Sequence, residues 1–228
     1  MNRMILLPVG LGALFLQGHS VLVSAVPRSE QRPKNAPFQW DWKHSRELPA
    51  EKSLRKAKIP STQKKAIAQA IGNYLRPICL GPEKSCVAVP ASSTGEITSD
   101  AELQLAVLDT RVALIDLNHD GVPEVVAQGM LNCGATGNCP FWIFQKTKAG
   151  YELLLDGEAQ MFTVQKSKPN GFCEIVLSTH GSSSSGSLVN YRYVEGVYQE
   201  AGCYYYDWTE LENDKVRELK APRITPCR

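Results

Sequence analysis

Apolar residues follow two different spacings along the chain, and the spacing changes at about Leu103. Between Ser61 and Pro77 they recur at i, i+3 and i+4, which places side chains on one face of an α-helix. This spacing predicts an amphipathic helix of about four turns that has Ser61 as its N-cap and ends before Pro77. The apolar stripe is typical of core packing, and its members are Ala66, Ile67, Ala70, Ile71, Tyr74 and Leu75.

From about Leu103 onward, short apolar runs alternate with turn-forming pairs such as Asp156-Gly157 and Asn170-Gly171. This pattern predicts antiparallel strands rather than βαβ units. The predicted strands are Val107–Leu117, Val122–Gln128, Phe141–Phe144, Tyr151–Leu155, Met161–Gln165, Phe172–Ser178, Leu188–Val194 and Val197–Tyr206. The serine run Ser182–Ser187 is expected to form a flexible loop. The expected fold is mainly β, an antiparallel meander (a sandwich-like or partial-propeller sheet) with one N-terminal amphipathic helix.

The N-terminus has the pattern of a secretory signal peptide. Arg3 is followed by a mostly apolar stretch from Ile5 to Val23, and the small residues Val23-Ser24-Ala25 predict a mature chain that begins at Val26. Polar residues, Gly and Pro interrupt the stretch, which argues against a membrane anchor. The expected organisation is a signal peptide at 1–25, a basic Pro-rich arm at 26–60, a helix and disulfide loop at 61–95, and an antiparallel β domain at 96–228. No later segment is apolar enough to span a membrane.

Seven cysteines in the predicted mature chain agree with export to an oxidising compartment, the periplasm or the medium. Proximity suggests that Cys79 pairs with Cys86, Cys133 with Cys139, and Cys173 with Cys203, which leaves Cys227 over. The sequence does not fix this connectivity, and Cys227 could displace any of these partners.

Charge is close to balance, with a formal net charge of +2. This argues against nucleic acid as the main partner, since that function favours a strongly basic face. One local exception is the basic cluster between Arg46 and Lys65, which we interpret as a solvated surface, with a polyanion site as the alternative.

The most informative motif is the acidic run from Asp116 to Glu124. Oxygen side chains stand at Asp116, Asn118 and Asp120, Gly121 permits a sharp turn, and a carboxylate returns at Glu124. In a calcium loop of this kind the three side chains, the backbone carbonyl of Val122 and the carboxylate of Glu124 would supply the oxygen ligands. The alternative is a plain hairpin turn at Asn118–Gly121 without a metal. His119 is expected to face solvent.

This motif resembles the Asp-rich calcium loop of FG-GAP and VCBS-type repeats in secreted and adhesive proteins. Further stretches are similar to a group of uncharacterised exported bacterial proteins, namely Cys133–Cys139, Trp142-Ile143-Phe144, Tyr151–Leu155 and Asn170-Gly171-Phe172. The resemblance covers about Leu114 to Tyr206 and implies a structural calcium site, but no known activity. Because the chain has one copy of the loop, it does not match a repeating propeller.

Two other features bear on function. Aromatic residues are dense late in the chain, either as strand packing or as a platform for a glycan or protein; they are Tyr191, Tyr193, Tyr198, Tyr204, Tyr205, Tyr206 and Trp208. His180 beside the serine run could serve as a base, but lone loop histidines are usually inert, and the sequence lacks a nucleophile elbow and a pair of nearby carboxylates.

The sequence therefore favours an exported, non-catalytic binding or interaction module with a structural calcium loop, whose partner is a protein or glycan. The alternatives are a secreted hydrolase of cell-wall or glycan material, or an inhibitor of such an enzyme.

Overall fold

The computed structural model describes residues 52–82, 86–87, 96–212 and 215–227. These all belong to the compact unit Pro37–Arg228. The predicted signal peptide and most of the predicted arm lie outside the described residues. The last part of that arm is described, and there Leu54 is fully buried and its N–H donates to the carbonyl of Thr110 at 2.8 Å.

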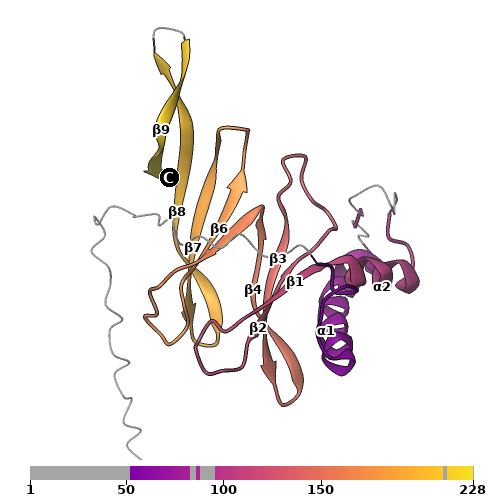
Figure 1. Cartoon of the computed structure of the whole chain (residues 1–228). Helices are drawn as coiled ribbons and strands as arrows, with labels where there is room; N and C mark the ends of the chain where they lie inside the picture. The colour runs from indigo at the N-terminus through magenta and orange to yellow at the C-terminus, as the bar shows by residue number, and fades with distance from the viewer. Residues whose placement is uncertain (1–51, 83–85, 88–95, 213–214, 228) are drawn as a thin grey trace, which may run out of the picture. The chain divides into compact units, whose positions relative to one another are not determined.

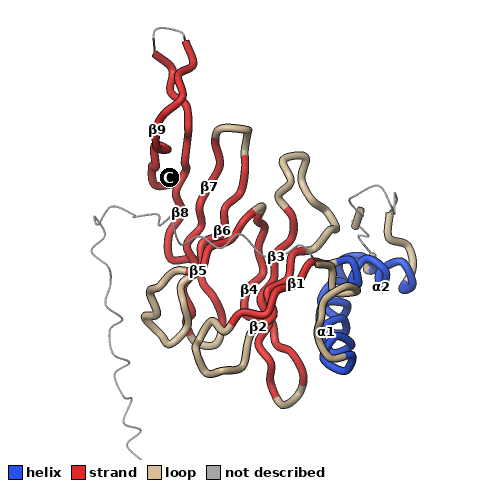
Figure 2. Tube along the Cα trace, viewed as in Figure 1, coloured by secondary structure: helices blue, strands red, loops and turns tan. Residues whose placement is uncertain are grey.

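Two antiparallel sheets dominate the described structure, which confirms the mainly β expectation (Figures 1 and 2). Each sheet is a meander in which sequence neighbours pair. The first contains β1 (Arg111–Ile115), β2 (Glu124–Gln128), β3 (Cys139–Thr147) and β4 (Gly150–Ala159). The second contains β5 (Met161–Val164), β6 (Ile175–His180), β7 (Ser185–Val194), β8 (Val197–Glu212) and β9 (Lys215–Pro226).

The first sheet is covered on both faces. One face packs against the helices through a core that includes Val125, Trp142 and Phe144. The opposite face packs against the second sheet, where Phe141 and Ile143 share a core with residues of β6. Because alternate strand residues point to opposite faces, every residue of β2 is buried, as a central strand between two layers requires.

The helix α1 (Ser61–Leu80) confirms the predicted stripe, since Ile67, Ile71 and Leu75 are buried. Its predicted end before Pro77 is wrong. Pro77 lies inside the helix, which continues for one more turn, so that Cys79 joins the core and forms a disulfide with Cys86. The predicted cap is also wrong, because Pro60 occupies the N-cap position and no side chain caps the helix.

A second helix, α2 (Asp100–Asp109), was not predicted and replaces the start of the expected strand at Val107. Ser99 and Glu102 form a reciprocal capping box, in which each side chain accepts from the other's backbone N–H. The spacing Ser-x-x-Glu is a recognised helix start, so the sequence did contain the signal.

Two of the three predicted disulfides are confirmed and the third is wrong. Cys79–Cys86 and Cys133–Cys139 form as expected, but Cys203 pairs with Cys227 and leaves Cys173 as a buried free thiol. The reason is the unpredicted strand β9, which runs antiparallel to β8 and places Cys227 beside Cys203, where its N–H donates to the carbonyl of Cys203 at 3.0 Å. Three disulfides fit an oxidising, extracellular environment.

Within the described part of the chain, neither helix is long and apolar enough to cross a membrane.

Candidate functional site

The acidic loop connects β1 to β2, which pair as the predicted hairpin. Asp116 organises the loop, because its carboxylate accepts from the backbone N–H of Asp120 at 3.2 Å and from that of Gly121 at 3.0 Å. His119 and Gly121 have positive φ angles of 61° and 85°, which turn the chain sharply.

The two following polar side chains also bond within the loop. Asn118 Oδ1 accepts from the N–H of Asp120 at 2.9 Å, and its amide nitrogen donates to Asp120 Oδ2 at 2.9 Å. Asp120 Oδ1 accepts from the N–H of Val122 at 2.7 Å. The loop thus holds its own shape through side-chain to backbone hydrogen bonds.

Glu124 differs from the other predicted ligands, because it is only 1 % exposed. Its Oε2 accepts from the N–H of Leu117 at 2.8 Å, on the inner side of the loop. Burial raises the pKa of the Glu124 carboxyl, and the nearby carboxylates of Asp120 and Asp116 raise this pKa further.

In this arrangement the described residues contain no group of three Asp, Glu, His or Cys side chains close enough to share a metal ion. The structure brings Asp116, Asn118 and Asp120 together, with Val122 bonded to the same cluster. Glu124 would have to turn outward to join them.

His119 is exposed, as expected, but its ring also has two contacts. Its Nδ1 is hydrogen-bonded to the amine of Lys168, and its Nε2 lies 4.0 Å from the sulfur of Cys173. Burial raises the pKa of the Cys173 thiol, so the sulfur stays protonated and weakly nucleophilic at neutral pH. These contacts join the acidic loop to the chain just before β6 and do not form a reactive thiol–imidazole pair.

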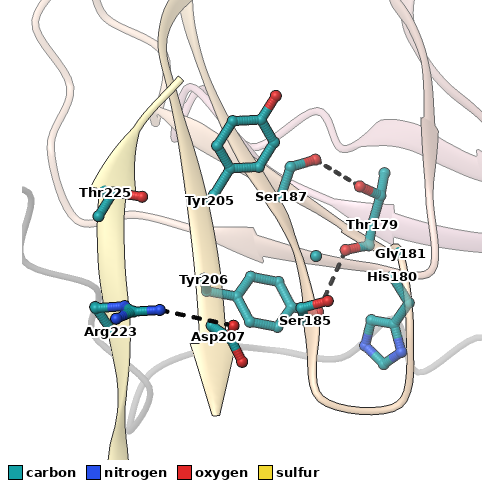
Figure 3. A pocket seen from close by; sticks show the side chains of 11 residues that line it. Thr179, His180, Gly181, Ser185, Ser187, Tyr205, Tyr206, Asp207, Arg223 and Thr225 are labelled. Atoms are coloured by element: carbon teal, nitrogen blue, oxygen red, sulfur yellow. Dashed lines mark hydrogen bonds and ion pairs between the residues drawn. The ribbon is translucent and has the colours of Figure 1, made fainter. Parts of the chain in front are cut away.

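A separate pocket of about 390 Å³ lies on the second sheet, where β6, β7, β8 and β9 run side by side (Figure 3). Strand register forms its first row, since Thr179 pairs with Ser187, Ser187 with Tyr205, and Tyr205 with Thr225. Residues directly opposite each other in an antiparallel sheet point to the same face. The row therefore presents three hydroxyls and one phenol side by side.

The second row of the pocket carries its charges. Asp207 pairs in register with Ser185 on one side and with Arg223 on the other. The Arg223 guanidinium lies 3.9 Å from the Asp207 carboxylate. Hydrogen bonds from the backbone N–H and hydroxyl of Thr209, and to a smaller extent the charge of Arg223, lower the pKa of Asp207, so it is a carboxylate at neutral pH.

Tyr205 is the exposed aromatic of this pocket, with 56 % of its surface accessible. Its neighbour Tyr206 is buried and lies over Gly186, where a Cβ would come within 2.7 Å of the phenol ring. The Tyr206 hydroxyl donates to the carbonyl of Thr179 at 3.3 Å, and burial raises its pKa. Tyr206 therefore shapes the pocket, whereas the ring of Tyr205 remains available.

The disulfide loop Cys133–Cys139 holds the end of β6 beside this pocket. The Asn138 side chain accepts from the N–H of His180 and donates to its carbonyl, both at 2.9 Å. This pair of hydrogen bonds fixes the backbone of His180 in the way that a neighbouring strand would.

The sequence pointed to part of this pocket. The aromatic cluster contained Tyr205 and the serine run contained Ser185 and Ser187, two residues that belong to β7 and not to the flexible loop expected there. Trp208, which belongs to the same predicted aromatic platform as Tyr205, does not line the pocket. Thr179, Arg223 and Thr225 were missed, because only the pairing of four strands brings them together.

The comparisons with known proteins returned no match among family models, curated proteins or solved structures.

Proposed function

We propose that this protein is an exported, non-catalytic binding module that holds a carbohydrate in the pocket between β6 and β9. The proposal rests on one observation. The exposed aromatic ring of Tyr205 lines the same pocket as a row of hydroxyls and the Asp207–Arg223 ion pair. A sugar ring has an apolar C–H face and a rim of hydroxyls. The ring of Tyr205 suits the face, and the polar groups suit the rim.

The size of the pocket supports a small ligand. Its volume of about 390 Å³ falls within the roughly 300–1,000 Å³ of small-molecule sites. The row from Thr179 to Thr225 spans four strands, so a short oligosaccharide could extend across the sheet.

The chemistry of the lining favours binding over hydrolysis. Glycoside hydrolysis uses a pair of carboxyl groups, one with a raised pKa, whereas this lining holds the single carboxylate Asp207, whose pKa is lowered. A serine nucleophile would need a base, but the Ser187 hydroxyl bonds Thr179 at 2.6 Å and the Ser185 hydroxyl bonds Ser182 at 2.8 Å. Among the described residues, neither serine is hydrogen-bonded to the His180 ring.

A structural calcium ion at the acidic loop is the second part of the proposal, and it fits the donor set. Each carboxylate oxygen of Asp116 and Asp120 accepts one hydrogen bond, three of them from loop backbone and one from the Asn118 amide, and each keeps a lone pair for a cation. Asn118, the Val122 carbonyl and Glu124 would complete an oxygen shell. Burial is the main cause of the raised pKa of Glu124, and a cation would offset the smaller contribution that comes from repulsion by Asp120 and Asp116.

Export and the resemblance to single-loop FG-GAP and VCBS-like proteins complete the proposal. The seven cysteines, six of them paired, support a protein that matures in the periplasm or outside the cell.

A glycan panel tests the proposed function. Mature protein is titrated against immobilised peptidoglycan fragments, chitooligosaccharides and surface polysaccharides, while released reducing ends are measured in parallel. We expect binding of one glycan class without release, reduced about tenfold or more in Tyr205→Ala, which corresponds to about 1.4 kcal/mol. Tyr205→Phe should retain binding, because the ring is kept.

Leu211→Ala is the matched control, since Leu211 is exposed on the same strand but does not line the pocket. Release of reducing ends would favour the hydrolase. Equal binding by wild type and Tyr205→Ala would exclude this pocket as the site.

A further inference from the structure

A groove of about 790 Å³ runs between α1 and α2, well separated in sequence from the strands of the glycan pocket. Along α1 its wall extends from Ser61 to Arg76, a length of about 22 Å at 1.5 Å per residue. The α2 side contributes Leu103 and Val107, which are buried in the helix core and form an apolar floor. The rim is exposed, so the groove is an open trough and not an enclosed cavity.

The middle of the α1 wall is made of small residues. Ala68 and Gly72 are four residues apart on the same face of the helix, at the level of Val107. A Cβ at Gly72 would meet the Val107 side chain at 4.0 Å, an ordinary van der Waals contact, so a β-carbon fits at this point without a clash. Small residues on a helix face let the backbone of another helix approach closely.

The charge of the groove has one sign. Its charged lining residues are all basic and are Lys64, Lys65 and Arg76. The twenty residues of α1 contain no Asp or Glu, whereas α2 carries Asp100, Glu102 and Asp109 outside the lining. Arg76 is paired with Asp100 at 2.5 Å and Arg55 with Asp109 at 3.1 Å, so the excess of positive charge rests on Lys64 and Lys65. The exposed Lys56 and Lys58, which precede the helix, add to that end.

This charge disfavours two nearby candidates for the groove. A second copy of α1 would bring like charges together. The chain's own segment 26–50 carries five Lys and Arg against three Asp and Glu, and it does not complement a basic rim either.

We propose that the α1–α2 groove binds an acidic amphipathic helix of a partner protein. Its apolar face would lie on Leu103, Val107 and the small residues of α1. Its carboxylates would pair with the exposed Lys65 and with Lys64, whose amine also donates to the carbonyl of Arg55 at 2.9 Å. This is the helix-in-groove mode of recognition, in which apolar anchors supply affinity and flanking charges choose the partner. The inference does not depend on the glycan pocket or on calcium.

The test uses a labelled synthetic amphipathic peptide of about five turns with leucines on one face and glutamates on its flanks, measured by fluorescence anisotropy on the full mature protein. A second peptide has lysine in place of every glutamate. We expect the acidic peptide to bind at least about tenfold more tightly than the basic one. The double variant Lys64→Glu/Lys65→Glu should reverse this order.

Gly72→Leu supplies an independent readout, because its side chain would occupy the groove. Leucine favours helix more than glycine does, so the variant should fold, and thermal melting checks this. We expect it to weaken the acidic peptide about tenfold or more. Lys148→Glu, an exposed charge reversal in the turn between β3 and β4, should leave binding unchanged.

Several results would overturn the proposal. These are equal binding of both peptides, unchanged binding by Gly72→Leu, or binding of anionic lipid vesicles in place of the peptide. A dimer in sedimentation that Gly72→Leu dissociates would assign the groove to a second copy of the chain.

Discussion

The hydroxyl of Tyr74 on α1 donates a hydrogen bond to the carboxylate of Asp156 on β4. The Tyr74 ring also packs edge-on against Trp142, with ring centroids 5.7 Å apart. Asp156 pairs in register with Trp142, so the hydroxyl and the ring of Tyr74 contact the two members of one cross-strand pair. This contact fastens the helix to the first sheet.

Tyr74 should make stability depend on alkaline pH. Burial, together with the hydrogen bond to Asp156 and the charge of Asp156, raises the pKa of Tyr74 from 10.0 to about 12. Because the folded pKa lies above the unfolded one, the stabilisation is complete below about pH 10 and is lost as pH rises toward 12. Urea unfolding at pH 8, 9.5 and 10.5 should show a falling midpoint in wild type and a flatter profile in Tyr74→Phe. Parallel profiles would show that the hydroxyl is not coupled to folding.

The thiol count should be one per chain and hidden in the folded protein. Cys173 is buried with a raised pKa, and the other six cysteines are paired. A thiol reagent should therefore react slowly with native protein and with one equivalent after unfolding in urea. Peptide mapping should recover the Cys203–Cys227 link. Cys203 linked to Cys173 would contradict the described pairing of β8 and β9.

Removing the Cys203–Cys227 link should destabilise the protein. Its closed loop has a sequence separation of 24, for which the chain-entropy model gives about 3.5 kcal/mol. The Cys203→Ser/Cys227→Ser double variant avoids a new free thiol, and urea unfolding measures the loss. A loss far below about 1 kcal/mol would mean that the reduced chain already holds these ends together.

Gly129 should tolerate no side chain. A Cβ there would come within 2.6 Å of the Trp142 ring, which is buried and cannot move aside. Gly129→Ala should therefore lower the free energy of unfolding by about 1–3 kcal/mol. Gly134→Ala is the matched control, since its Cβ would meet only ordinary contacts at 3.9 Å. Equal effects of the two substitutions would mean that the strain is not local to Trp142.

Calcium should stabilise the acidic loop modestly. At an affinity of about 0.1–1 mM, millimolar calcium adds roughly 0.4–1.4 kcal/mol, or about 1–5 °C in melting temperature for a domain of this size. Chelator-treated protein should regain that shift on addition of calcium, and Asp116→Ala and Asp120→Ala should abolish it. Glu152→Gln, which removes an exposed charge on β4, is the control. A melting temperature that ignores calcium would leave the motif as a plain hairpin turn.

The local spacing of apolar residues predicted α1 and most of the first sheet. Ile67, Ile71 and Leu75 have helical spacing, and the short apolar run at Val125 is typical of a buried strand. The local spacing missed α2, whose apolar residues surround the helix and form no clear stripe, although the Ser99–Glu102 spacing marked its start. It also missed β9, where lysine, arginine and glutamate alternate with few apolar residues.

The candidate pocket could not be predicted from the spacing of residues within single segments, for a physical reason. Tyr205 stood out as one of several late aromatics, but the burial of its neighbour Tyr206 depends on Gly186, which leaves room for the Tyr206 ring. The position of Thr225 opposite Tyr205 depends on the β8–β9 register. Such neighbours are set by pairing between distant segments, which spacing within one segment does not encode.

Two-dimensional amide NMR during titration with the tightest oligosaccharide of the panel tests the central claim most directly. Binding in the pocket predicts that the largest shift changes fall on Thr179, Ser187, Tyr205 and Thr225, and that they saturate together. Saturating changes centred elsewhere, on the acidic loop or on α1, or the absence of any saturable change, would contradict it.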